Sequence, residues 1–255
     1  MHYERLDFFL YILAALVPCG FITTYLIALS NGHVRAFLPY ISDTGTEPPE
    51  SCIFAQFLAF GALIQLIISY IRYHHLKLVI NSTQSTHLSK HNILGFIFGV
   101  ISSVGVTIVG SFQETNVVAI HFLGAGLAYG GLFFYNLIQT FLSKKLSTVL
   151  RSNKKLYFLR FKLLCLSFTL GLLFSIFSAI SRSKFHGKNK IKWGPDDGGY
   201  AEHIVSTASE WLLTFGQLGL LLTFASDFRR IKIAYPTVYD PHLDNIQSST
   251  GYQTI

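Results

Sequence analysis

Charged side chains are scarce in this 255-residue chain. Asp, Glu, Lys and Arg together make up 13% of it, whereas 51% of the residues are hydrophobic. Soluble domains carry charge on about a quarter of their residues. Too few polar side chains are therefore present to cover a water-soluble globule, and the apolar surface is expected to face lipid.

Cysteine is also scarce, and its distribution excludes two kinds of protein. Cys19, Cys52 and Cys165 are the three cysteines, and each falls inside or at the start of an apolar run. No Cys-x-x-Cys pair and no Cys/His metal spacing occurs. A disulfide framework is therefore excluded, and neither a metal nor another cofactor is predicted.

A cleavable signal sequence is not expected. Residues 2–7, which precede the first apolar run, lack a cluster of positive charge. The run itself covers residues 8–29, which is too long for the core of a signal peptide and long enough to cross a bilayer. We therefore expect it to be retained as a helix.

Six apolar runs approach or exceed the roughly 20 residues that a helix needs to cross the hydrocarbon core. They cover residues 8–29, 52–70, 93–112, 117–142, 161–180 and 204–226. Barrel strands would alternate polar and apolar residues, and these runs do not. The sequence predicts an all-α, polytopic bundle of six transmembrane helices over residues 1–231, followed by a tail over residues 232–255.

Positive charge predicts the orientation of the bundle. The N-terminal segment, the second and fourth connections and the tail together hold 14 Lys and Arg residues, against 6 in the other three connections. Segments rich in Lys and Arg face the cytosol. Both termini are therefore expected in the cytosol, which leaves two long connections, residues 30–51 and 181–203, on the lumenal side.

The fourth connection is the most basic segment, and two interpretations of it stay open. A cytosolic segment of this charge is attracted to anionic lipid headgroups, or it serves only to set the topology. Nucleic-acid binding is not predicted, because the net charge of +7 follows the topology and no nucleic-acid motif is present. The residues expected to contact anionic lipid are Lys144, Lys145, Arg151, Lys154, Lys155, Arg160 and Lys162.

The two lumenal connections are rich in turn-forming residues and aromatics. Proline and glycine specify a fixed, turn-rich path, and the aromatic side chains supply apolar anchors. Both segments are therefore expected to be ordered caps. Their candidate residues are Pro39, Tyr40, Ser42, Asp43, Gly45, Pro49, Glu50, Trp193, Pro195, Asp196 and Asp197.

Polar side chains inside spans are costly and therefore informative. His121 lies early in the fourth run and Glu210 early in the sixth, and both are expected near the lumenal leaflet beneath Asp43. Such a cluster can carry out acid–base chemistry, or it can tie helices together by hydrogen bonds. The structural role is favoured, because neither an HExxH motif nor a nucleophile motif accompanies these residues.

The tail contains two tyrosine motifs. Tyr235 and Val238 form one, and Tyr252 and Ile255 form the other at the end of the chain. A tyrosine, two variable residues and a bulky aliphatic residue resemble the signals that clathrin adaptors bind as an extended strand. The sequence therefore predicts that adaptors are partners and that the protein is sorted to lysosomes.

Glycines in the third and fourth runs are spaced four residues apart. Gly95 and Gly99 form one pair, and Gly126 and Gly130 form another. This spacing allows two helix backbones to approach closely. Packing within the bundle is the expected role, and a contact in a homo-oligomer is the alternative.

Several motifs in order resemble the DRAM family, the damage-regulated autophagy modulators. The agreement runs from about residue 8 to residue 231. The second and fourth connections and the tail lie outside it. The motifs that carry the resemblance are Pro39–Gly45 with Pro49 and Glu50, Arg72-Tyr73, Phe112-Gln113, His121 with Gly124-Ala125, Trp193–Asp197 with Gly199-Tyr200, and Ala208–Trp211.

The resemblance implies a six-helix protein of lysosomal or late endosomal membranes that promotes autophagy, with links to cell death in some members. We therefore predict a non-enzymatic, multi-pass lysosomal membrane protein that modulates autophagy and contacts membrane lipids. A lipid-handling enzyme or lipid-binding protein with a polar site at the lumenal leaflet is the alternative, since the wider superfamily includes lipid-remodelling proteins. A small-solute transporter is a third reading, but it needs a continuous polar route between helices.

Overall fold

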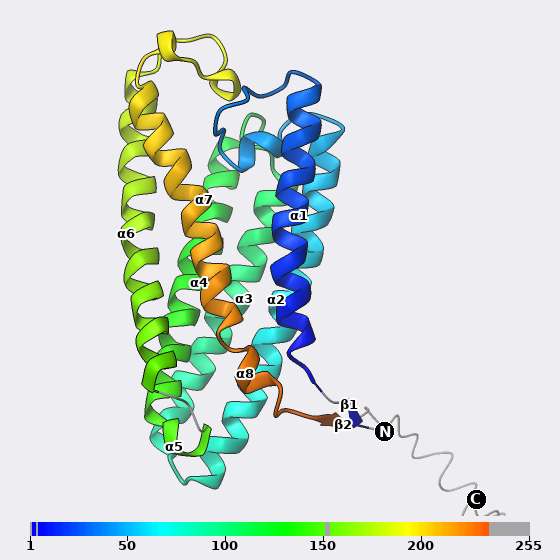
Figure 1. Ribbon diagram of the computed structural model, residues 1–255, viewed down its shortest axis with the longest axis vertical. Helices are drawn as coiled ribbons and strands as arrows, with labels where there is room; N and C mark the ends of the chain where they lie inside the picture. Colours follow the sequence, from blue (N-terminus) through cyan, green and yellow to red (C-terminus); the bar gives the residue numbers. More distant parts are fainter. Residues whose placement is uncertain (1, 4, 151–153, 235–255) are drawn as a thin grey trace, which may run out of the picture.

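Six long helices form an elongated bundle (Figure 1). The computed structural model describes residues 2–3, 5–150 and 154–234. The helices are α1 (Phe8–Ser30), α2 (Glu50–Ser82), α3 (Ser89–Ser111), α4 (Val118–Lys145), α6 (Lys154–Lys184) and α7 (Tyr200–Leu222). Each is long and apolar enough to cross a membrane. The predicted all-α bundle of six spans is confirmed.

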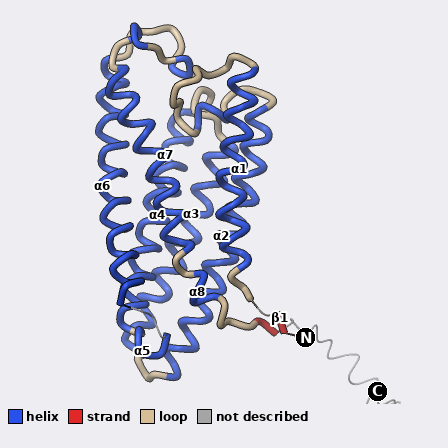
Figure 2. The backbone as a smooth tube through the Cα atoms, in the orientation of Figure 1, coloured by secondary structure: helices blue, strands red, loops and turns tan. Residues whose placement is uncertain are grey.

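Short elements cap both ends of the bundle. Two helices of one turn, α5 (Ser147–Leu150) and α8 (Ala225–Phe228), lie at the end where β1 (His2–Tyr3) pairs antiparallel with β2 (Ile233–Ala234). We call this the terminal end, because the described parts of both termini meet there. The long connections 31–49 and 185–199 gather at the opposite end, the loop end (Figure 2). The remaining short elements are the 3-10 turns Ser42–Gly45, Thr86–Leu88, Lys190–Lys192 and Pro195–Asp197.

Helix α2 extends well past its predicted span toward the terminal end. The second predicted span ends at residue 70, whereas α2 continues to Ser82. The extra turns of α2 bury apolar side chains against α4 and α5, in a cluster of Leu76, Val79, Ile80, Leu88, Leu142, Leu146 and Leu150. Hydropathy marks only the part of a helix that suits lipid, while the helix continues as long as one face is buried.

Glycines allow close helix packing at some positions and leave open space at others. A Cβ at Gly105 would collide with the backbone of Ala128, and one at Gly131 would lie 2.8 Å from the backbone nitrogen of Ser102, so α3 and α4 pack backbone to backbone. A Cβ at Gly99 would lie 2.5 Å from the Ser69 hydroxyl of α2. By contrast, a Cβ at Gly126 or Gly130 would meet no atom within 4 Å. The packing role predicted for that second pair within the bundle is therefore wrong.

The outer surface of the bundle is apolar. Large hydrophobic side chains are more than half exposed along several helices, among them Leu26, Phe60, Leu123, Phe168, Ile176 and Leu212. Such a surface is stable in hydrocarbon and unfavourable in water.

Candidate functional site

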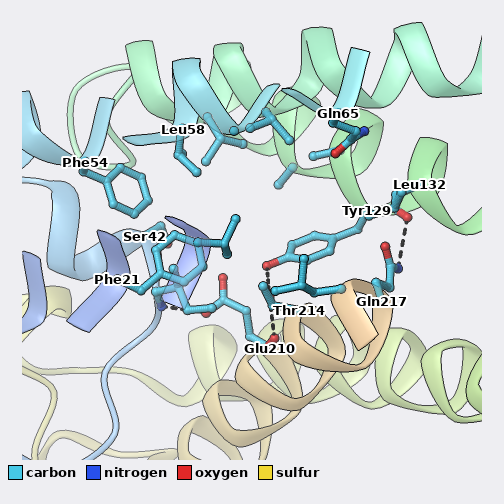
Figure 3. Close-up of a pocket in the computed structure, with 18 of the residues that line it drawn as sticks. Phe21, Ser42, Phe54, Leu58, Gln65, Tyr129, Leu132, Glu210, Thr214 and Gln217 are labelled. Atoms are coloured by element: carbon cyan, nitrogen blue, oxygen red, sulfur yellow. Dashed lines mark hydrogen bonds between the residues drawn. The ribbon is translucent and has the colours of Figure 1, made fainter. Parts of the chain in front are cut away.

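A cavity lies between the helices, starting beneath the first long connection (Figure 3). It has a volume of about 130 Å³, and α1, α2, α3, α4 and α7 supply its walls together with Ile41 and Ser42. Most of its surface is apolar, from Leu13, Val17, Phe21, Phe54, Leu58, Val106, Val109, Leu132, Leu218 and Leu221. Three of the features predicted from sequence, the first cap, His121 and Glu210, therefore meet around one space.

Glu210 is the acidic residue of this cavity. Its side chain is 5% exposed, and Oε2 accepts a hydrogen bond from the backbone nitrogen of Ile41 at 2.8 Å. The other carboxyl oxygen points into the cavity (Figure 3). Among the described residues, no Lys, Arg or His forms an ion pair with Glu210. One turn along α7, Thr214 hydrogen-bonds the Tyr129 hydroxyl at 2.8 Å and fixes that ring in the cavity.

His121 lines the same cavity but is bonded outside it. Its Nδ1 lies 2.7 Å from the carbonyl oxygen of Phe112. A carbonyl only accepts, so Nδ1 donates the hydrogen of this bond. The imidazole thereby ties the first turn of α4 to the end of α3.

Asp43 lies in the 3-10 turn beside the cavity rather than in its wall. Its carboxylate accepts a hydrogen bond from the Tyr40 backbone nitrogen at 3.2 Å. Burial, reinforced by the carboxylates of Glu114 and Glu210, raises the pKa of Asp43 well above its ordinary value. In the described part of the chain, no group of three His, Cys, Asp or Glu residues is placed to hold a metal ion.

Glu114 and Arg182 complete the polar shell at the loop end, and sequence reasoning missed both. Glu114 accepts a hydrogen bond from Ser42 at 2.8 Å and pairs with Arg182 at 2.6 Å. The Arg182 guanidinium also lies over the Phe122 ring, 4.3 Å from its centroid. The sequence signal for Glu114 is a single acidic residue in a short, otherwise uncharged connection. Arg182 lies in the last turn of α6, and no sequence motif singles it out.

Side-chain and backbone contacts anchor both predicted caps. The Trp193 indole donates to the carbonyl oxygen of Gly198 at 2.8 Å and stacks on His203, with ring centroids 4.5 Å apart. The Tyr40 ring meets the same imidazole edge-on at 5.0 Å. Glu50 is fully buried and pairs with His33.

Tight backbone contacts place the remaining cap residues. The Pro39 carbonyl accepts a hydrogen bond from the Trp211 indole at 2.9 Å, and Asp197 accepts one from the Gly194 nitrogen at 2.7 Å. A Cβ at Gly45 would collide with the Phe54 ring, so this turn needs glycine. Pro49, Pro195 and Asp196 are exposed.

A larger groove of about 630 Å³ runs between α4 and α6. It shares Ala125, Tyr129 and Gln217 with the interior cavity, so the two spaces adjoin. The outer wall of the groove includes exposed side chains such as Phe134 and Phe168, and the groove therefore opens on the lipid-facing surface. Gly126, Gly130 and Gly171 leave its floor open. The hydroxyl of Ser167 and Oε1 of Gln217, both buried, have no hydrogen-bond partner.

At the terminal end, Arg160 lies away from the basic surface to which sequence analysis assigned it. Its side chain is fully buried, with Nη2 3.3 Å from Asp227 and Nε 2.9 Å from the Thr223 hydroxyl. Arg72 of α2 reaches the same Asp227 oxygen at 3.3 Å. The Phe224 ring also contacts the Arg160 guanidinium, at 3.8 Å from the ring centroid. Arg160 therefore joins helices and has no access to lipid headgroups.

The other residues predicted to contact lipid lie either at exposed helix ends or outside the described residues. Exposed residues at the ends of α4 and α6 are Lys144, Lys145, Lys154, Lys155 and Lys162. The Lys144 ammonium lies 4.8 Å from the centroid of the Tyr157 ring. Arg151 and the sorting-signal residues Tyr235, Val238, Tyr252 and Ile255 lie outside the described residues, and their roles stay predictions.

Comparison with known proteins covers almost the whole bundle. Residues 7–231 match the family model of the Frag1/DRAM/Sfk1/Cwh43P N-terminal domain. The chain is 33% identical to DNA damage-regulated autophagy modulator protein 2 of Rattus norvegicus over 238 residues, 92% of this chain and 85% of the relative. It is 32% identical to DNA damage-regulated autophagy modulator protein 1 of Homo sapiens over 229 residues, 89% of this chain and 92% of the relative.

A third relative is the zebrafish (Danio rerio) modulator of macroautophagy TMEM150B, 32% identical over 230 residues, 89% of this chain and 87% of the relative. No solved structure matches the chain. The matched range includes the first cap, α4 and α7, where the sequence motifs lie. The chain belongs to the DRAM family of multi-pass membrane proteins.

Proposed function

We propose that this protein modulates autophagy as a non-enzymatic, multi-pass protein of the lysosomal or late endosomal membrane, with both termini in the cytosol. One observation carries the proposal: relatives named as autophagy modulators are about one-third identical over at least 84% of the chain. The likeness includes the caps and the helices around the cavity, which are the parts that distinguish this bundle from a generic six-span protein.

The bonding of the polar side chains supports a non-enzymatic role. Glu210, Asp43 and His121 each bind a backbone group of a neighbouring segment. All three thereby hold the first cap or the α3–α4 connection in place. These contacts favour structural positions for Asp43 and His121, while Glu210 combines such a contact with one oxygen that faces the cavity.

The test of the function is the restoration of autophagic flux. Cells that lack the protein are compared with the same cells after re-expression, and turnover of an autophagosome-associated substrate is measured with lysosomal proteolysis either active or blocked. We expect lower flux without the protein and recovery on re-expression. Equal flux in both cell lines would remove the proposal.

The proposed location depends on the two tyrosine motifs of the tail. Adaptors bind such motifs through a pocket for the tyrosine and another for the aliphatic residue. We expect Tyr235→Ala combined with Tyr252→Ala to move the protein from lysosomes to the cell surface, as measured by surface biotinylation. The matched control is Tyr239→Ala, which alters a tail tyrosine outside both motifs. Unchanged lysosomal residence of the double variant would contradict adaptor sorting.

A second function, lipid binding, is favoured by the groove between α4 and α6. The groove opens on the lipid-facing surface, its floor lacks side chains, and Ser167 and Gln217 offer polar atoms without partners. A hydrocarbon chain would fill the space, and a polar group of the lipid could bond to these atoms.

This second function can be tested by lipid co-purification. Mass spectrometry of the purified protein should detect bound lipid, and Gly130→Leu should reduce the amount by filling the groove. Gly219→Leu is the matched control, since a Cβ at Gly219 also meets no atom within 4 Å but the residue lines neither space. Equal lipid content in both variants would exclude the groove as the site.

A further inference from the structure

The interior cavity presents a buried acidic group without a basic partner. Glu210 is 5% exposed, its Oε2 is occupied by the Ile41 nitrogen, and its other oxygen faces the cavity (Figure 3). The nearby Arg182 is already paired with Glu114. Burying a carboxylate without a counter-charge is costly. A ligand that brings a positive charge into the cavity would offset this cost.

Aromatic rings add to the suitability of the cavity for a cation. Phe21, Phe54 and Tyr129 all line it together with Glu210. Cations are attracted to the faces of aromatic rings, most strongly where water is excluded. A carboxylate among aromatic rings is the chemistry that recognises a protonated amine.

The size and remaining walls of the cavity limit the body of the ligand. Apolar cavities of about 150 Å³ take up benzene, and this one has a volume of about 130 Å³ with mostly apolar walls. It therefore suits a ring or chain of about six carbons. Two amide atoms without hydrogen-bond partners, Nε2 of Gln65 and Oε1 of Gln217, leave further polar contacts open deeper in the bundle.

We propose that the interior cavity is a binding site for a small organic cation, a primary amine on an apolar ring or short chain, held by Glu210. The ammonium group donates to the free carboxyl oxygen and contacts the aromatic rings. The apolar body of the ligand fills the rest of the interior cavity. The groove that shares Ala125, Tyr129 and Gln217 with the cavity gives the ligand access from the bilayer. This site adjoins the lipid groove, with which it shares Gln217, and it is independent of sorting by the tail.

The test compares three small-molecule probes that share a phenylethyl body and differ only in their polar head group. These are 2-phenylethylamine, 2-phenylethanol and 3-phenylpropionate, tritiated and equilibrated by dialysis with the purified full chain in detergent micelles at pH 7. Uptake by protein-free micelles is subtracted. We expect the amine to bind about tenfold more tightly than the alcohol, because hydrogen bonds to charged groups contribute on that scale. The acid should not bind, since Glu210 repels it.

Two variants locate the binding. Glu210→Gln keeps an oxygen for the Ile41 nitrogen and should remove the preference for the amine. Glu47→Gln changes an exposed residue that does not line the cavity, and it should retain the preference. Gly61→Leu should abolish amine binding with Glu210 intact, because a Cβ at Gly61 lies 3.8 Å from its nearest neighbour and a larger side chain extends into the cavity.

Equal binding of amine and alcohol by the unchanged chain would overturn the inference, as would a preference for the amine that survives Glu210→Gln. If Glu210→Gln fails to fold, the probe series on the unchanged chain and Gly61→Leu still decide the question. Loss of autophagic function is not a readout here, so failure of this inference leaves the proposed function unaffected.

Discussion

The two ends of the bundle bury different balances of charge. At the terminal end, the guanidinium groups of Arg72 and Arg160 share one carboxylate, Asp227. At the loop end, acidic groups are in excess: Asp43, Glu50, Glu114 and Glu210 are buried or half-buried, and the basic partners among the described residues are Arg182 and His33. The other buried carboxylate of the terminal end, Asp7, is also paired with an arginine, Arg229, whereas acidic groups outnumber their basic partners beneath the caps.

This difference affects how each end can respond to its surroundings. An arginine stays charged at any pH a protein experiences, so the network around Asp227 is a permanent connection between α2, α6 and α8. A buried carboxyl can take up a proton and lose its charge. Burial raises the pKa of Asp43 at the loop end, so this end takes up a proton at a higher pH than an ordinary carboxyl does, while the arginines of the terminal end stay charged.

The largest expected effect comes from removing the shared carboxylate of the terminal end. Asp227→Asn leaves two fully buried guanidinium groups without a counter-charge, and breaking such buried pairs costs about 3–5 kcal/mol. We expect most of the folded protein to be lost, as measured by fluorescence-detected size exclusion and by unfolding in detergent.

The control for this variant is Asp196→Asn, which changes an exposed aspartate at the loop end. It should unfold like the unchanged protein. If Asp227→Asn were equally stable, the network would contribute nothing and the contrast between the ends would lose its energetic basis.

A pH titration examines the opposite end. Because burial raises the pKa of Asp43 above its ordinary value near 4, the folded state binds this proton more tightly than the unfolded state does. Stability should therefore rise as pH falls through the raised pKa, and the gain should be complete near the unfolded value. Each pH unit in that window contributes at most about 1.4 kcal/mol.

Asp43→Asn separates this effect from other titrating groups. Asparagine still offers an oxygen to the Tyr40 nitrogen but cannot titrate. We expect the variant to be more stable than the unchanged protein at pH 7.5, with a weaker gain on acidification to pH 5, measured as the midpoint of thermal unfolding. An identical pH profile in both proteins would show that Asp43 does not titrate in this range.

The contrast between the ends also shows what the sequence could predict. Six spans followed from composition, because lipid demands long apolar helices and each run satisfies that demand alone. Which side chains pair with one another could not be predicted from composition in this way. Arg160 was assigned to a basic surface because of its neighbours in the chain, while its actual partner, Asp227, lies far along the chain in another helix. That pair depends on how α6 packs against α8, which no local pattern specifies.

The cavity illustrates the same limit. Glu210 and His121 were singled out because polar groups inside a span are costly, and the structure brings both to one cavity. Its shape depends on the space left among side chains of five helices, and Glu114, which ties the cap to Arg182, lies in a connection too short to show a motif. Each helix could therefore be predicted from its own residues, whereas the site could not be predicted without knowing how the helices pack.

The smallest effect is expected for the ion pair between Glu114 and Arg182 at the loop end. Its strength can be compared directly with that of the Asp227 network. The side chains of Glu114 and Arg182 are 14% and 24% exposed, so solvent screens their attraction more than it does at the fully buried network. A double-mutant cycle with Glu114→Gln and Arg182→Gln should give a coupling energy of about 0.5–1 kcal/mol in detergent unfolding. Higher salt should reduce this coupling and leave the defect of Asp227→Asn unchanged. A coupling as large as the Asp227 effect would mean that both ends are held by equally desolvated charges, and the distinction between a permanent and an adjustable end would then rest on titration alone.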